Sequence, residues 1–86
     1  MVDDLLVRMR NNPAGDWKID DVERVRRRYG ISGRPPTGGG SHYKISHAAV
    51  AEILTVPSRH PLKPRYISLL VRFVRVVIAS QSRSNP

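Results

Sequence analysis

Residues 41–57 read SHYKISHAAVAEILTVP, and this stretch decides the fold class. In its first six residues the apolar side chains of Tyr43 and Ile45 alternate with the polar side chains of His42 and Lys44. Because successive side chains of a strand point to opposite faces, this period of two predicts a strand with one buried face and one exposed face. The stretch therefore predicts a sheet in the middle of the chain.

Two further strands are predicted, one on each side of that strand. Residues 53–56 form a short apolar and β-branched run that ends at Pro57, and residues 31–34 form a weaker one. Residues 48–52 are expected to be a short connection or one helical turn, and the proline and glycine residues of 35–40 predict a loop. Connections this short favour an antiparallel meander.

Helices are predicted at both ends of the chain. Residues 2–10 carry apolar side chains at helical spacing, and residues 19–29 begin with acidic residues, end with arginines and stop at Gly30. A last helix begins near Pro64 and carries two apolar stripes, one more than packing against a small sheet requires. The surplus stripe predicts contact with the N-terminal helix, with a second subunit or with a partner chain.

These elements predict a single α+β domain. The expected architecture is a three-stranded antiparallel sheet packed on one face by two helices, in the order α-β-β-β-α, with an extra N-terminal helix. A chain of 86 residues suits one domain. We expect an N-terminal amphipathic helix over residues 1–12, the main domain over residues 17–79 and a polar, disordered tail over residues 80–86.

Net charge is the strongest compositional signal. The chain has 15 Lys and Arg residues against 7 Asp and Glu residues, a formal net charge of +8. Residues 1–23 hold three basic and six acidic residues and carry −3, whereas residues 24–86 hold twelve basic residues and only Glu52 and carry +11. A domain this one-sided should attract a polyanion, with nucleic acid first and an anionic membrane second.

Composition also disfavours several kinds of site and location. The chain has no cysteine, and its three histidines do not have the spacing of a zinc site, so we expect no metal and no cofactor. Asp3 and Asp4 stand where a signal peptide would be positively charged. The apolar stretch 66–79 contains two arginines and is shorter than the ~20 residues that span a bilayer. We therefore expect a cytoplasmic protein without a membrane segment.

A set of short motifs resembles the HicA family of mRNA-interferase toxins. Gly39-Gly40-Ser41-His42 resembles the Gly-Ser-His strand start of HicA, and an amphipathic helix that ends at Gly30 precedes it. The run 53–57 follows, then His60, and Leu62-Lys63-Pro64 opens an apolar helix in the order found in HicA. The similarity covers residues 17–77. The N-terminal helix and the two prolines and triple glycine before His42 are departures from the family pattern.

The resemblance implies a fold, an activity and a partner. The implied fold is like that of double-stranded-RNA-binding domains, and the implied activity is ribosome-independent cleavage of mRNA with His42 as the catalytic residue. The implied partner is a HicB-type antitoxin in the bacterial cytoplasm, and the assembly is a toxin–antitoxin complex or a homodimer. The two departures leave the geometry of the partner interface and the register of the RNA open.

Metal-free RNA cleavage also needs groups around the histidine. Attack of a ribose 2′-hydroxyl on the neighbouring phosphate needs a base, an acid and cations that face the phosphorane charge. A histidine side chain, which ordinarily titrates near pH ~6.5, can move such a proton. Lys44 shares the strand face of His42 about 7 Å away along the strand, and we assign it to the charge of the transition state.

RNA-binding residues are assigned by comparison with the implied fold. Domains of this shape contact RNA through the loop between the first two strands and through the start of the last helix. The matching residues are basic or glycine-rich, and the predicted RNA-binding set is Arg34, Gly39, Gly40, Ser41, Lys44, Lys63 and Arg65. Phosphate contacts of this kind predict little sequence preference and a steep dependence on salt.

Other interpretations of the same residues stay open. His42 can be an ordinary surface histidine, and His47 and His60 are expected to be structural or exposed. The arginines of residues 24–28 can be a solvated helix end, which the helix dipole favours, or a contact for RNA or the antitoxin. On these readings the chain is a non-catalytic RNA-binding module of the same fold, or a structural protein whose last helix docks into a partner.

Overall fold

The described residues of the chain form three helices and three strands. In chain order these are α1 (Asp4–Asn11), α2 (Ile19–Arg28), β1 (Ser32–Arg34), β2 (His42–His47), β3 (Val50–Pro57) and α3 (Pro64–Arg83). The structure is a computed structural model that describes residues 4–35, 42–59 and 61–83. The three strands form one antiparallel sheet of order β1-β2-β3, which confirms the predicted α+β class.

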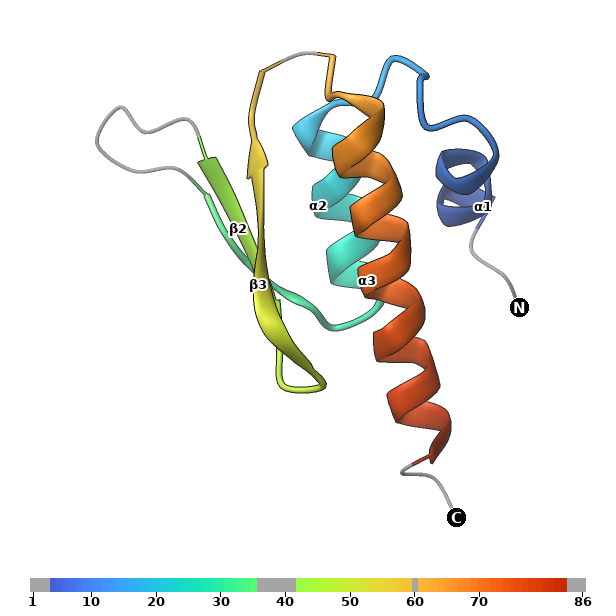
Figure 1. Ribbon diagram of the computed structural model, residues 1–86, viewed down its shortest axis with the longest axis vertical. Helices are drawn as coiled ribbons and strands as arrows, with labels where there is room; N and C mark the ends of the chain where they lie inside the picture. The colour runs from blue at the N-terminus through green and yellow to red at the C-terminus, as the bar shows by residue number, and fades with distance from the viewer. Residues whose placement is uncertain (1–3, 36–41, 60, 84–86) are drawn as a thin grey trace.

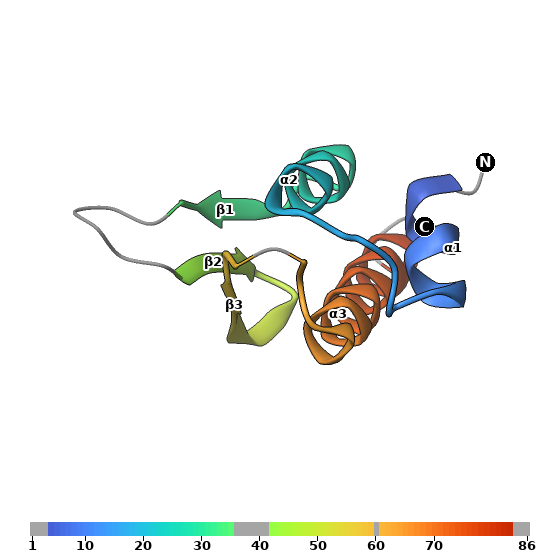
Figure 2. The ribbon, with the colours of Figure 1, turned by 90° about the horizontal axis from the view of Figure 1, so that it is seen from above.

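The elements are arranged in layers (Figure 1). In the view from above, the sheet forms one layer, α2 and α3 form a second layer beside it, and α1 lies beyond α3 on the side away from the sheet (Figure 2). α2 packs near β1, and α3 packs near β3. The other face of the sheet carries no described helix, as the sequence predicted.

The central strand β2 sets the two faces of the sheet. Tyr43 and Ile45 are buried, while His42 and Lys44 are exposed. Tyr43 lies opposite the buried Val56 of β3, so these side chains share the helix-covered face. The period of two in the sequence is therefore confirmed, and it leaves His42 and Lys44 accessible from solvent.

The turn between β2 and β3 differs from the expectation. β3 begins at Val50, so residues 50–52 belong to a strand and not to a connection or a helical turn. The turn itself is formed by residues 48 and 49, where the backbone N–H of Ala49 donates a 3.0 Å hydrogen bond to Nδ1 of His47. Because this bond satisfies a backbone donor in the tight turn, His47 has a structural role, the first of the two alternatives that the sequence left for it.

Helix ends follow local signals at α2 but not at the end of α3. At the start of α2 the backbone N–H of Lys18 donates a 2.9 Å hydrogen bond to Oδ2 of Asp21, and after its end Gly30 adopts a φ of 67°. α3 continues to Arg83, so the disordered tail expected from residue 80 is wrong for residues 80–83. Residues 84–86 of that predicted tail lie outside the described residues.

One hydrophobic core joins all three helices to the sheet. Leu6 and Met9 of α1 belong to the same buried cluster as Val25 of α2, Ile45 of β2 and Leu70 of α3. α1 therefore covers part of the surplus apolar surface of α3, the first of the three contacts that the sequence allowed. Within the described ranges, no helix is both long enough and apolar enough to cross a membrane.

The packing of α1 can be tested with Met9, whose side chain has no exposed surface. Met9→Ala should lower the free energy of unfolding by ~2–5 kcal/mol, because it removes buried methylene groups and leaves a cavity. Arg10→Ala, at an exposed neighbouring position, should change it by less than ~0.5 kcal/mol. Urea denaturation followed by circular dichroism measures both, and equal stabilities would show that α1 lies outside the cooperative fold.

Candidate active site

A cleft of about 350 Å³ lies where β2 begins and the chain enters α3. Six residues line it: His42, Pro57, Arg59, Pro61, Lys63 and Tyr66. His42 is the first residue of β2, and Pro57 is its cross-strand partner at the end of β3. The connection between β3 and α3 supplies the facing wall with Lys63, and the first turn of α3 supplies Tyr66.

The cleft is suited to an anion. Three of its lining side chains are a histidine, an arginine and a lysine, and no carboxylate is among the described residues that line it. His42, Arg59 and Lys63 are all exposed, so a ligand from solvent can reach them. A phosphate group in this cleft would meet an imidazole that can transfer a proton and two cations that can hold its oxygens.

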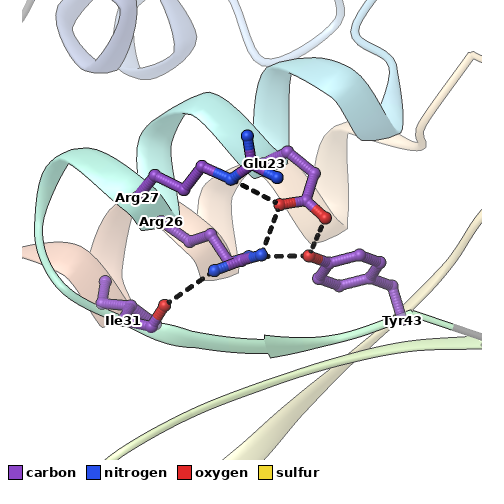
Figure 3. A network of polar contacts seen from close by, with 5 residues as sticks. All are labelled: Glu23, Arg26, Arg27, Ile31 and Tyr43. Atoms are coloured by element: carbon purple, nitrogen blue, oxygen red, sulfur yellow. Dashed lines mark hydrogen bonds and ion pairs between the residues drawn. The ribbon is translucent and has the colours of Figure 1, made fainter.

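A half-buried polar network holds β2, and with it His42, against α2 (Figure 3). The hydroxyl of Tyr43 donates a hydrogen bond to Oε1 of Glu23 and accepts one of 2.7 Å from Nε of Arg26. Nη2 of Arg26 forms an ion pair of 2.7 Å with Oε2 of Glu23. Arg26 thus hydrogen-bonds the tyrosine and forms an ion pair with the carboxylate, and Tyr43 is only 1% exposed.

The same network corrects one interpretation of the arginine run 24–28. Nη1 of Arg26 donates to the backbone oxygen of Ile31 at 3.4 Å, so this side chain ties α2 to the residue before β1. Arg27 lies 3.5 Å from the Glu23 carboxylate and is largely exposed. The run is therefore neither a fully solvated helix end nor wholly available to RNA or a partner.

Gly33 makes room for this network. A methyl group at Gly33 would overlap the Arg26 side chain and the Tyr43 hydroxyl. Gly33 lies opposite Ile45 in the β1–β2 register, directly over the buried face of the sheet. The absence of a side chain at this position allows the polar groups of α2 to reach Tyr43.

The wall of the cleft that carries Lys63 is fixed from the other end of the chain. The backbone N–H of Leu62 donates a 2.8 Å hydrogen bond to the backbone oxygen of Trp17, and both side chains are buried. Nε1 of Trp17 in turn donates to the backbone oxygen of Asn12 at 2.7 Å, and the Arg8 guanidinium lies 5.7 Å from the ring centre. The segment after α1 therefore positions Lys63.

A second cationic surface lies on the open face of the sheet. Arg34 of β1 and Lys44 of β2 are cross-strand partners, and both side chains are exposed. In the part of the chain that the structure describes, no carboxylate pairs with either of them. Like charges at directly opposed positions are destabilising unless an anion lies between them, so this pair also favours a polyanion.

The structure brings together only some of the predicted site residues. His42 and Lys63 share the cleft, whereas Lys44 and Arg34 lie on the adjoining sheet face and Arg65 is exposed on α3 outside the cleft lining. The predicted residues Gly39, Gly40 and Ser41, and also His60, lie outside the described residues.

Four residues of the cleft are absent from the predicted set, and two of them, Arg59 and Tyr66, have polar side chains. Tyr66 stands in the apolar sequence of the last helix, and its side chain is half-buried. The signal in the sequence is the segment 57–64, in which basic residues lie between prolines. Prolines stiffen such a connector, so its basic side chains are held near the ends of the strands.

Metal ligation and similarity to known proteins add no further assignment. Among the described residues, no three His, Cys, Asp or Glu side chains lie together in a way that could hold a metal ion. Comparison with protein-family models, with curated proteins and with solved structures found no match. The function is therefore argued from the residues and from the geometry of the cleft.

Gly33→Ala tests the close packing around the network. The added methyl group must displace Arg26 or Tyr43, and we expect the free energy of unfolding to fall by ~1–3 kcal/mol. Ser32→Ala, at the exposed neighbouring position of β1, should change it by less than ~0.5 kcal/mol. Urea titration of both variants makes the comparison, and an unchanged midpoint for Gly33→Ala would contradict the packing described here.

The pH dependence of stability tests the burial of Tyr43. Burial raises the pKa of its hydroxyl above the ordinary value of 10.0, and the hydrogen bond to Glu23 acts in the same direction. The folded state holds this proton more tightly than the unfolded state. The contribution of Tyr43 to the free energy of unfolding is therefore fully present below pH 10.0 and is lost as the pH rises above it. Tyr43→Phe should flatten this alkaline loss in thermal melts, while Tyr66→Phe should keep the wild-type slope.

Proposed function

We propose that this chain is an endoribonuclease toxin that cleaves mRNA with His42 and is neutralised by a HicB-type antitoxin. One observation carries the proposal: an exposed histidine lies in a cleft with Arg59 and Lys63, without a carboxylate among the described lining residues. The net charge of +11 over residues 24–86 and the resemblance of residues 39–42 to the HicA motif support it.

The proposed reaction needs only the substrate and the side chains of the chain. The ribose 2′-oxygen attacks the adjacent phosphorus and loses its proton, and the bond from phosphorus to the 5′-oxygen breaks as that oxygen gains a proton. His42 performs one of these two proton transfers. Lys63 and Arg59, which line the cleft, take the place first assigned to Lys44 and face the charge that develops on the phosphate oxygens. The products are a 2′,3′-cyclic phosphate and a 5′-hydroxyl end.

RNA binding is assigned to the cleft and to the sheet face beside it. The order α-β-β-β-α, and a sheet face that no described helix covers, are consistent with the double-stranded-RNA-binding-like fold that the motifs imply. Arg34 and Lys44 would contact phosphates next to the cleft, with Lys63 and Arg59 within it. Such contacts predict affinity that falls steeply with salt.

The antitoxin and the location belong to the same proposal. A chain with a net charge of +8 is expected to pair with a protein that presents an acidic surface, and covering the cleft would block RNA. We place this toxin–antitoxin complex in the bacterial cytoplasm, where its mRNA substrate is translated.

His42→Ala tests the proposed chemistry. The wild-type chain should cleave a labelled RNA in the presence of a chelator and yield cyclic phosphate ends. His42→Ala should slow cleavage by ~100-fold or more, because it removes a proton-transfer group, and should keep RNA affinity within about threefold. Expression of the two genes in bacteria should give growth arrest for the wild type only.

His47→Ala is the matched control, since His47 is structural and lies at the opposite end of β2. It should keep the wild-type cleavage rate. Equal cleavage by His42→Ala and the wild type would overturn the catalytic assignment. RNA binding without any cleavage by the wild type would favour a non-catalytic RNA-binding module, and no RNA affinity even at low salt would favour a partner-docking protein.

A further inference from the structure

The outer face of α3 keeps an exposed apolar stripe after α1 and the sheet have packed against the helix. We define the α3 face as Ser68, Leu69, Arg72, Arg75, Val76 and Ala79, all of them exposed. Leu69 and Val76 are 38% and 44% exposed and lie one heptad apart. Apolar residues spaced in this way along a helix form a surface on which a second helix can pack.

Two grooves border the α3 face, and Arg72 and Val76 line both of them. The groove toward α1 has a volume of about 580 Å³ and includes Arg10 and Arg75. The groove toward β3 has a volume of about 450 Å³ and includes Glu52 and Ile53, whose side chain is 61% exposed. Apolar surface is therefore continuous from the edge strand across α3.

The charge of these grooves identifies the chemistry of an occupant. Their lining contains Arg10, Arg72 and Arg75 against the single carboxylate of Glu52. No ion pair joins any of these arginines to a carboxylate of the described chain. An occupant that satisfies this face must bring apolar side chains for Leu69 and Val76 and carboxylates for the arginines.

Other occupants fit less well. A second copy would bring the same three arginines against one another and would join two chains of net charge +8. RNA would satisfy the arginines but would leave the exposed apolar side chains against phosphate and ribose. We propose that the α3 face binds an acidic amphipathic helix of a partner protein.

This docking surface is separate from the candidate active site. None of the six residues that line the His42 cleft lines either groove beside α3. A helix bound to the α3 face would therefore not by itself block RNA from the cleft. The inference does not depend on the chemistry of His42, so it can fail or succeed independently of the proposed function.

A synthetic peptide tests the proposal on the full chain. The probe is a helix of about three heptads with leucine at the a and d positions and glutamate at the flanking positions. Fluorescence anisotropy should show binding to the wild type, weakened about tenfold or more by Arg72→Glu combined with Arg75→Glu. Leu69→Ser combined with Val76→Ser should weaken it to a similar degree, and thermal melts establish that both variants fold.

Matched controls separate the α3 face from general attraction to a basic protein. Arg24→Glu makes one charge reversal of the same kind at an exposed position of α2, half the charge change of the double variant, and should keep the affinity within about twofold. A peptide with lysine in place of glutamate should bind the wild type weakly and the double arginine variant more tightly. NMR shift changes should appear on the α3 face and at Arg10, and not at His42 or Lys63.

Several results would overturn the proposal. An equal loss of affinity in Arg24→Glu would show diffuse electrostatic binding, and shift changes at the His42 cleft would place the peptide at the RNA site. Shift changes confined to β3 would show an added strand and not a helix. A dimer of the chain alone that Val76→Glu dissociates would assign the face to a second copy.

Discussion

The hydroxyl group of Tyr43 is buried between β2 and α2, where it is held by Glu23 and Arg26. Leaving such a group unpaired would cost ~1–3 kcal/mol, so β2 is strongly held in the register that keeps the tyrosine in this place. A change of one residue in the register of β2 would expose the side chains of Tyr43 and Ile45 and would point those of His42 and Lys44 toward the core. The orientation of the candidate active site therefore depends on a polar contact on the opposite face of the strand.

The layered arrangement divides the molecule into surfaces of different chemistry. The open sheet face and the cleft present cations that can follow a phosphate backbone, with the pair Arg34 and Lys44 beside His42. The outer face of α3 presents apolar side chains between arginines, which nucleic acid cannot satisfy as a whole. Because no residue that lines the His42 cleft also lines a groove beside α3, a ligand on one surface need not compete with a ligand on the other.

Local patterns predicted the elements, while the contacts between distant residues could not be read from the sequence. The alternation around Tyr43 predicted β2 and the exposure of His42, and Gly30 predicted the end of α2. The run 48–52 is rich in alanine, and nothing local indicates that His47 would stabilise a tight turn and let β3 begin at Val50. No helix-breaking residue lies between residues 79 and 83, so polarity alone was a poor guide to the end of α3.

The candidate site shows the same limit. His42 and Lys63 were assigned from motifs, but Arg59 and Tyr66 reach the cleft only because Pro57 pairs with His42 and the connector then turns back toward α3. The hydrogen bond from Leu62 to Trp17 adds a constraint on timing, because it joins segments made early and late in synthesis. A nascent chain that ends at residue 60 contains the histidine but lacks Lys63, Tyr66 and the whole of α3. Prematurely terminated products would thus be inert at this cleft, and the complete cleft forms only once the C-terminal helix has left the ribosome and packed.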